Sequence, residues 1–100
     1  MPYARYNEFE PSDDRSTPTY DGVQAQLNVK QDPPPGLIFH SAGFGEDGVF
    51  RIYEVWESRE EAERFFDERI MPAVNEVTEG EPSPPVKQEL YELHNFERFG

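Results

Sequence analysis

The connection between two strand-like segments in the middle of the chain constrains the fold more than any other feature. Residues 37–42 and 49–56 are rich in residues that favour strands, and the glycine-rich segment 43–48 separates them. So short a connection joins antiparallel neighbours, because parallel strands need a crossover of about a dozen residues or more. Residues 49–56 carry large apolar side chains at both odd and even positions, which predicts that both faces of the sheet are covered there.

A long helix is predicted directly after this hairpin. Ser58 and Glu61 have the spacing of a capping box, in which the Ser58 hydroxyl accepts from a helical N–H and the Glu61 carboxylate accepts from the Ser58 N–H. From there to Val77, apolar residues recur on one face and charged residues lie on the other. Pro72 lacks a backbone donor and clashes with the preceding turn, so a kink or a break is expected near residues 70–71.

A shorter helix is predicted before the hairpin. Thr17 is expected to cap its first N–H groups, and Pro18 suits the first helical position. Gly22 weakens this helix by up to about 1 kcal/mol relative to Ala, so packing must hold it in place. The proline run at residues 32–36 then ends the helix and forms a stiff strap. The face expected to pack carries Tyr20, Val23, Gln24 and Leu27.

The two ends of the chain supply the remaining strands. Residues 3–9 and 86–94 alternate well enough to form strands, residues 10–15 have the composition of a loop, and the tail at 95–100 is expected to dock through its two Phe. The order is then strand, helix, strand, strand, helix, strand. This order is typical of a ferredoxin-like α+β fold, in which an antiparallel four-stranded sheet carries both helices on one face. The whole chain, residues 1–100, fits a single domain of this kind.

The balance of charge excludes several classes of partner. The chain has 9 Lys and Arg residues against 21 Asp and Glu residues, which gives a formal net charge of −12. Nucleic acids and anionic membrane surfaces both attract basic proteins, so neither is an expected partner. The sequence shows neither a signal peptide nor an apolar run long enough to span a bilayer, which predicts a cytoplasmic protein.

The second face of the sheet is expected to be covered by another copy of the chain. Each predicted helix has a single apolar stripe, so both helices must lie on the same face of the sheet. The composition includes eight Phe, five Tyr and one Trp, and some of these large side chains remain for the other face. Because soluble monomers avoid large exposed apolar patches, a homodimer formed sheet to sheet is predicted.

His40 and Glu54 are the predicted catalytic pair. They lie on the two strands of the hairpin, and a histidine can move a proton to or from a substrate near neutral pH while a carboxylate orients its ring. A turn near residues 45–46 would place His40 opposite Arg51 or Ile52, with Glu54 one diagonal step away. The residues expected to bind an aromatic ligand beside this pair are Phe50, Ile52, Trp56 and His94, of which the first three share a face with Glu54.

Structural roles for the same residues stay open at this point. Either histidine could be a hydrogen-bonded structural residue, Glu54 could pair with Arg5 or Arg51 across the sheet, and Trp56 could belong to the core. No metal site is predicted, because the chain has no cysteine and no motif that brings three ligands together. No cofactor is predicted either, since the glycine-rich connection lacks the helix and the lysine of a phosphate-binding loop.

Three stretches of the sequence resemble one superfamily. They are residues 33–43 (PPPGLIFHSAG), 55–60 (VWESRE) and 94–95 (HN). Together they resemble small actinobacterial-type proteins of the dimeric α+β-barrel superfamily, to which the antibiotic-biosynthesis-monooxygenase-like proteins belong, over most of residues 20–96. The resemblance implies a dimer whose sheets enclose a barrel, with a pocket between each sheet and its helices or inside the barrel. The acidic loop before the first helix is longer here than in better-known members.

Two hypotheses about function follow from this resemblance, because the superfamily includes cofactor-independent oxygenases, haem-degrading proteins, cyclases, isomerases and members without a known activity. The first is a small cofactor-independent enzyme that oxygenates, cyclises or isomerises an aromatic or polycyclic molecule. The alternative is a non-catalytic dimeric protein that binds a ligand or serves as an accessory. A roomy cavity in which His40 contacts an acid favours the enzyme, and a filled barrel favours the accessory protein.

Overall fold

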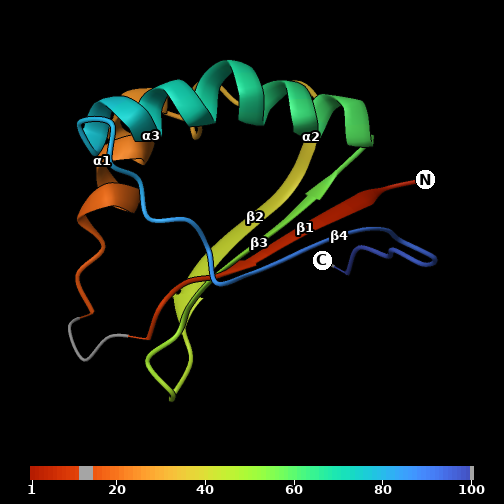
Figure 1. Ribbon diagram of the computed structural model, residues 1–100. Coiled ribbons are helices and arrows are strands. Elements are labelled where there is room, and N and C mark those ends of the chain that lie inside the picture. Colours follow the sequence, from red (N-terminus) through yellow and green to blue (C-terminus); the bar gives the residue numbers. More distant parts are fainter. Residues whose placement is uncertain (12–14, 100) are drawn as a thin grey trace.

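The computed structural model describes residues 1–11 and 15–99 and shows two layers, a sheet and a helical layer (Figure 1). Of the loop predicted at residues 10–15, residues 12–14 lie outside the described part. The sheet is antiparallel with strand order β2-β3-β1-β4, and the helices lie on one of its faces. The ferredoxin-like prediction is therefore confirmed. The elements are β1 (Tyr3–Glu8), α1 (Pro18–Leu27), β2 (Leu37–Phe44), β3 (Phe50–Trp56), α2 (Arg59–Phe65), the π-helical turn η1 (Phe66–Ile70), α3 (Met71–Val77) and β4 (Lys87–Glu92).

The β2–β3 hairpin has a register that differs from the predicted one. His40 lies directly opposite Glu54, not opposite Arg51 or Ile52. The reason is the length of the connection, whose turn is centred near Asp47 instead of at residues 45–46. Backbone hydrogen bonds from the Gly45 N–H to the Val49 carbonyl and from the Gly48 N–H to the Gly45 carbonyl close it, both at 3.0 Å. Gly48 has a φ of 79°, a conformation that favours glycine.

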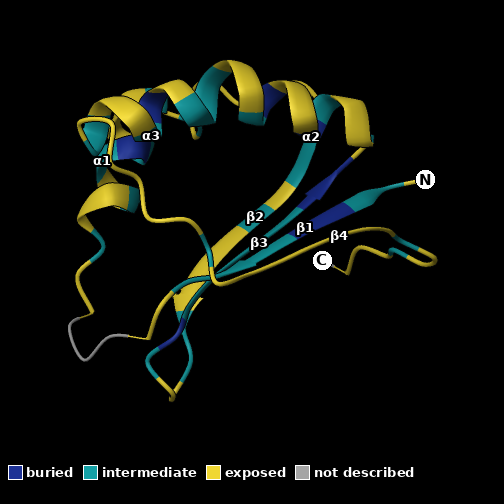
Figure 2. Cartoon of the chain, viewed as in Figure 1, coloured by how far each residue is buried: buried dark blue, intermediate teal, exposed yellow. Residues whose placement is uncertain are grey.

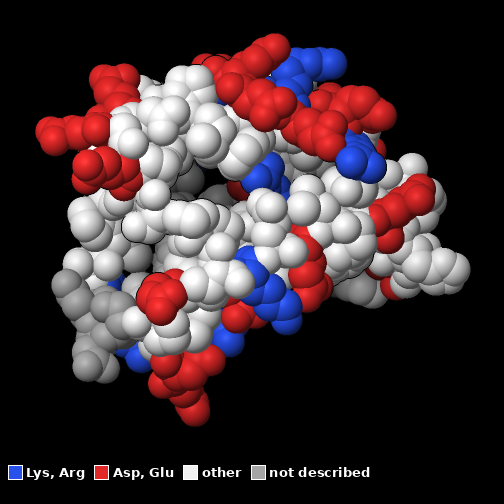
Figure 3. All heavy atoms as spheres, in the orientation of Figure 1, with Lys and Arg blue, Asp and Glu red and all other residues white. Residues whose placement is uncertain are grey.

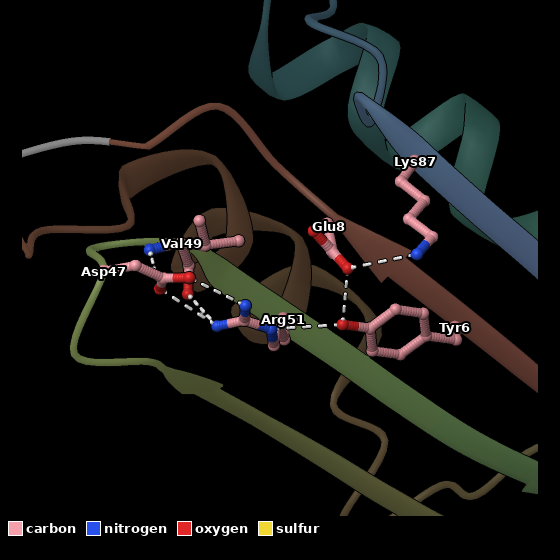
Figure 4. A network of polar contacts seen from close by, with 6 residues as sticks. All are labelled: Tyr6, Glu8, Asp47, Val49, Arg51 and Lys87. Carbon is pink, nitrogen blue, oxygen red and sulfur yellow. Dashed lines mark hydrogen bonds and ion pairs between the residues drawn. The ribbon is translucent and has the colours of Figure 1, made fainter.

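A network of charged and polar side chains on the outer face, the face away from the helices, fastens this hairpin to the strands beside it (Figure 4). The Arg51 guanidinium contacts the Asp47 carboxylate at 2.9 Å and donates to the Tyr6 hydroxyl at 3.1 Å. The Tyr6 hydroxyl in turn donates to Glu8 at 2.8 Å, and Lys87 lies 3.9 Å from the same carboxylate. The hydrogen bonds from Arg51 lower the pKa of Asp47 to about 2, so the turn stays ionised and paired near neutral pH.

The second helical segment begins at the predicted capping box. The Ser58 hydroxyl oxygen accepts from the Glu61 N–H at 3.2 Å, as expected. The reciprocal contact differs, since the Glu61 carboxylate accepts from the Ser58 hydroxyl at 2.9 Å instead of from its N–H. Gly36 passes close to this carboxylate with a φ of 89°, and a Cβ there would lie 2.5 Å from the Glu61 Cδ. A side chain at residue 36 would therefore disturb the start of the helix.

Pro72 widens this helical segment where a kink or a break was expected. The structure shows one continuous run through α2, η1 and α3, without a break at residues 70–71 (Figure 1). The turn just before the proline is π-helical, and the Met71 N–H donates to the Phe66 carbonyl five residues earlier. A π-helical turn accommodates the missing N–H of proline and the bulk of its ring without ending the helix.

Packing, more than capping, holds α1 in place. The prediction that Thr17 caps this helix is wrong: its hydroxyl donates to the Asp21 carboxylate at 3.1 Å and makes no capping hydrogen bond. The Asp21 carboxylate, four residues later in the chain, competes with the helix backbone for the Thr17 hydroxyl. Gly22 has a low intrinsic helix propensity, but it allows α1 to approach α3 closely. A Cβ at this position would lie 3.0 Å from Val77 Cγ1. Gln26 adds a hydrogen bond of 3.0 Å to Glu76 on α3.

The core joins the two layers at the end where β3 leads into α2. Trp56 and Ala62 are each 1% exposed and Phe65 is 7% exposed, and the rings of Trp56 and Phe65 lie 5.5 Å apart between centroids. Figure 2 shows buried stretches at this end of β3 and in α2. The half-buried side chains that complete this cluster are Leu27, Val29, Leu37 and Ile70. Residues from α1, β2, β3 and the second helical segment thus meet in one place, as the single apolar stripe of each helix predicted.

The end of the chain differs from its prediction. β4 stops at Glu92, two residues before the predicted end of the strand. Phe99 is 87% exposed, so the prediction that both tail Phe dock is wrong for this residue. The last backbone contact of the sheet is the hydrogen bond from the Leu93 N–H to the Pro2 carbonyl at 2.8 Å. Within residues 1–11 and 15–99, no helix combines the length and the apolar character needed to cross a bilayer.

The Phe65→Ala substitution tests the joint between the layers. Truncating this buried ring should lower the free energy of unfolding by about 3–5 kcal/mol, because it leaves a cavity against Trp56. Urea unfolding followed by circular dichroism measures the change. The matched control is Phe99→Ala, which removes the same ring from an exposed site and should change the free energy by about 0.5 kcal/mol or less. Equal effects of the two substitutions would contradict this view of the core.

Candidate active site

A cavity of about 730 Å³ lies between the sheet and the helical layer. Its floor is formed by side chains of β1, β2 and β3, and its roof by α1 and the second helical segment. The loop of residues 82–85 closes part of its rim. Figure 3 shows the surface hollowed between the two layers, with acidic side chains gathered over the helices. The volume falls within the range of about 300–1,000 Å³ that is typical of small-molecule sites, and most lining residues are apolar.

His40 and Glu54 meet on the floor of this cavity. Because they are direct partners in the β2–β3 register, their side chains leave the sheet on the same face. The His40 Nδ1 lies 2.8 Å from Glu54 Oε2. Trp56, two residues further along β3 and therefore on the same face, donates its indole N–H to Glu54 Oε1 at 3.2 Å. Both carboxylate oxygens thus have a partner, and the side chains of His40 and Glu54 are only 24% and 15% exposed.

Tyr20 extends this series from the helical layer. It lies on the first turn of α1, and its hydroxyl is 2.7 Å from His40 Nε2. The two rings are nearly parallel, with an interplanar angle of 5°. Phe50 packs edge-on against the Tyr20 ring with centroids 5.3 Å apart, which holds the hydroxyl in place. Tyr20, His40, Glu54 and Trp56 therefore form one hydrogen-bonded series, called here the Tyr20–Trp56 series.

The chemistry of the groups indicates the direction of each hydrogen bond. An ionised carboxylate only accepts, so Glu54 requires the proton of His40 on Nδ1. The Nε2 of neutral His40 is then an acceptor, and it receives the Tyr20 O–H. Burial raises the pKa of Tyr20 above its ordinary value of 10, and the negative charges of Glu54 and Asp21 raise it further. Tyr20 therefore remains a neutral donor at neutral pH.

This arrangement can accept a proton from a molecule in the cavity. A carboxylate that holds the imidazole in one tautomer and stabilises the imidazolium is the same device that activates the base in hydrolytic triads. The Tyr20 oxygen can accept a proton from a ligand as it gives its own to Nε2, or a ligand hydroxyl can take its place. Among residues 1–11 and 15–99, no group of three or more His, Asp or Glu side chains has the geometry to hold a metal ion.

The structure brings most of the residues singled out from the sequence into one place. Phe50, Ile52 and Trp56 line the cavity together with His40 and Glu54. His94 does not line it. It follows β4, which ends at Glu92, and its side chain is exposed. The alternation that was expected to place His94 on the cavity face does not extend beyond the end of the strand.

The sequence analysis did not predict that three further residues line the cavity. Tyr20 was expected only to pack, and no local pattern shows which strand residue its hydroxyl reaches. Arg5 was considered only as an ion-pair partner of Glu54; it lies opposite Glu54 in the β1–β3 register, but its guanidinium stacks on the ring of Phe66 instead. Asn7 shares the face of Arg5 on β1 and lines the cavity too. The polar residues alternating along β1 were the available signal.

Comparison with known proteins places the fold but not a family. No protein-family model matches the chain, and none of the curated proteins matches it. Solved structures do match over nearly the whole length. Rv0793 from Mycobacterium tuberculosis superposes with a TM-score of 0.71 at 14% identity, covering 98% of this chain and 100% of that one.

Two further structures have names that include an activity. SnoaB from Streptomyces nogalater, described as a cofactor-independent oxygenase, superposes with a TM-score of 0.63 at 14% identity over 95% of each chain. An antibiotic-biosynthesis-monooxygenase-like protein from Chloroflexus aurantiacus gives a TM-score of 0.63 at 16% identity over 100% of each chain. The fold is thus that of the antibiotic-biosynthesis-monooxygenase-like proteins, in agreement with the resemblance seen in the sequence. Identities this low establish the fold alone.

The hydrogen bonds of His40 predict that its neutral ring carries the proton on Nδ1. Nitrogen NMR shifts distinguish protonated from unprotonated ring nitrogens and measure this directly. Replacing Glu54→Ala removes the acceptor at Nδ1 and should move the population towards the Nε2–H tautomer. The exposed His94 is the control in the same spectra and should not change. A native His40 protonated on Nε2 would contradict the assigned directions.

Proposed function

We propose that this protein is a small cofactor-independent enzyme that removes a proton from an aromatic or polycyclic molecule bound between α1 and the sheet. The observation that carries the proposal is the Tyr20–Trp56 series on the wall of a ligand-sized cavity. A neutral histidine has one donor and one acceptor nitrogen, and each ring nitrogen of His40 has a partner. His40 has an oriented ring, a half-buried carboxylate behind it and a hydroxyl in front of it, which together make a general base.

The composition of the cavity supports an aromatic substrate. Aromatic side chains from β2, β3 and α1 line it, including Phe44, Phe50 and Tyr20, and Phe9 adds a further ring directly after β1. Such side chains bind flat rings through their faces and edges. The lining includes two carboxylates, those of Glu10 and Glu54, and the second of these belongs to the base.

Proton removal is the step that oxygenation, cyclisation and isomerisation of such a molecule share. Each can begin from the carbanion or enolate left when a base removes a proton beside a carbonyl group. The oxygenase described for SnoaB and the monooxygenase-like name of the Chloroflexus aurantiacus protein support oxygenation among these. In that reaction the carbanion would react with molecular oxygen, which is the oxidant, and His40 would be the base that forms the carbanion.

Deuterium exchange of a carbon acid tests the proposal without knowledge of the natural substrate. Anthrone, a three-ring ketone with an acidic methylene group, is the probe. In anaerobic deuterated buffer, the protein should accelerate the loss of the methylene proton signal in NMR spectra. His40→Ala should lower the protein-dependent rate by about 10²–10⁴-fold, because it removes the base.

The other histidine of the chain provides the matched control. His94→Ala should leave the exchange rate unchanged, since His94 is exposed and lies outside the cavity. Thermal unfolding of His40→Ala separates a catalytic from a structural role. A large fall in melting temperature with unchanged exchange would refute the role as base. Binding of anthrone without faster exchange in the native protein would favour the non-catalytic ligand-binding alternative.

We also propose that two copies of the chain associate through the outer face of the sheet. This face carries the row Phe39, Val55, Ala4 and Tyr91, which are successive partners in the strand registers. Phe39 is 47% and Tyr91 is 43% exposed, and Tyr53 packs against Phe39 with ring centroids 6.1 Å apart. An aromatic surface of this kind is stabilised by burial against a second copy.

Light scattering tests this association. The native protein at tens of micromolar should show twice the 11.6 kDa mass of one chain. The double substitution Phe39→Glu and Tyr91→Glu should give a monomer, because it places four like charges between the two faces. Ala25→Glu, on the exposed surface of α1, is the control and should leave the dimer intact. A native protein of single-chain mass would contradict the proposal.

A further inference from the structure

The cavity contains a buried cation whose charge the mechanism above does not use. Arg5 lies on β1 and is 8% exposed, and it lines the cavity. Its guanidinium carbon lies 3.9 Å from the centroid of the Phe66 ring, so the planar group is held against an aromatic face. Arginine stays charged in proteins and has five N–H donors in a rigid fork.

Within residues 1–11 and 15–99 this charge has no direct counter-ion. Among the described residues, no carboxylate lies within ion-pair distance of the Arg5 guanidinium, and none accepts a hydrogen bond from it. Burial lowers the pKa of Arg5, while the acids Glu54, Asp67 and Glu63 act at longer range in the opposite direction. Glu54 lies opposite Arg5 in the β1–β3 register. Its two carboxylate oxygens already have hydrogen-bond partners in His40 and Trp56. An arginine buried in this way is expected to be paired.

Asn7 provides a second unpaired polar group beside Arg5. It is two residues along β1, on the same face, and it also lines the cavity. Its Oδ1 is buried and has no hydrogen-bond partner among residues 1–11 and 15–99. Buried polar atoms of this kind are rare in folded proteins and indicate a missing partner. Arg5 and Asn7 are called here the β1 pair.

The β1 pair lies at a definite place relative to the base. Leu90, Arg5, Glu54 and His40 are successive partners across the four strands, so Arg5 and His40 lie on the two sides of Glu54. Neighbouring strands are about 4.7–4.9 Å apart, which separates the Cα atoms of Arg5 and His40 by about 10 Å. A fused ring system can span this distance, with one end at the β1 pair and the other at the Tyr20 hydroxyl.

The charges around the cavity restrict the chemical class of the ligand further. Arg5 is the sole Lys or Arg in the described lining of the cavity, so the site offers one positive charge. The chain as a whole has a net charge of −12, and acidic side chains gather over the helices above the hollow (Figure 3). This field opposes polyanions such as nucleotides. It admits a molecule with a single anionic oxygen.

We infer that Arg5, held against Phe66, binds an anionic oxygen of the substrate, and that the substrate is therefore an aromatic molecule with one carboxylate or one ionised ring oxygen. The inference rests on the proposed function, since it takes the cavity to be the site of an aromatic ligand.

Two probes of similar size, one anionic and one neutral, test this site. 2-Naphthoate carries a carboxylate, and 2-naphthamide is its neutral counterpart. The native protein should bind naphthoate at least about tenfold more tightly in calorimetric titrations, because charge-assisted hydrogen bonds are about twice as strong as neutral ones. Arg5→Met should remove this preference and leave the affinity for naphthamide within about threefold, since the apolar side chain keeps the packing.

Two further variants complete the test. Arg64→Met removes the same charge from an exposed site on α2 and should preserve the preference, which separates direct contact from the change in net charge. Asn7→Ala should preserve the preference for naphthoate, because the unpaired Asn7 Oδ1 is a hydrogen-bond acceptor and does not bind an anion. The thermal stability of Arg5→Met should equal or exceed that of the native protein, because an unpaired buried charge has been removed.

The outcomes distinguish this inference from the proposed function. Equal binding of both probes, or a preference for naphthoate that survives Arg5→Met, overturns the role of Arg5 and leaves an aromatic cavity in place. Failure of both probes to bind overturns the inference together with its premise, the aromatic-binding cavity. Loss of the preference in Arg5→Met with its survival in Arg64→Met establishes the anion site.

Discussion

The packing of Trp56 against Phe65 is the contact on which the rest of the structure depends. Trp56 ends β3 and Phe65 ends α2, so this contact joins the two layers where the chain passes from sheet to helix. Beside this joint the same two layers enclose the cavity, which Trp56 and Phe65 both line. Because the Trp56 indole also donates to Glu54, the residue that closes the core orients the carboxylate of the candidate site. The stability of the fold and the geometry of the base therefore have a common origin.

The floor of the cavity shows two ways of burying polar groups. His40 and Glu54 satisfy each other and have further partners in Tyr20 and Trp56, which compensates the loss of water around them. The β1 pair, one strand away, lacks such partners. A small domain has little stability to spare, and unpaired buried polar groups lower it. Their presence beside a complete hydrogen-bonded series is consistent with a site whose last partner is a ligand.

Local patterns predicted the elements well where one short segment contains the whole signal. The capping box at Ser58 and the run of strand-favouring residues in β3 are examples, because the signal lies within a few residues. Local patterns failed where a neighbour offered a competing contact. Thr17 bonds Asp21 instead of the helix backbone, and the turn before Pro72 widens instead of breaking, since the rest of the helical segment is held by packing against the sheet and α1.

The sequence by itself determined the order of the elements, the single packing face of each helix and the presence of His40 and Glu54 on adjoining strands. These follow from spacing within segments and from the shortness of the hairpin connection. Only the tertiary structure decided that His40 faces Glu54 directly, because a glycine-rich connection allows several registers and a slip of one residue exchanges the faces. It also decided that Tyr20 reaches His40 and that Arg5 lies beside Glu54 unpaired, since these side chains come from elements far apart in the chain and meet only when the layers pack.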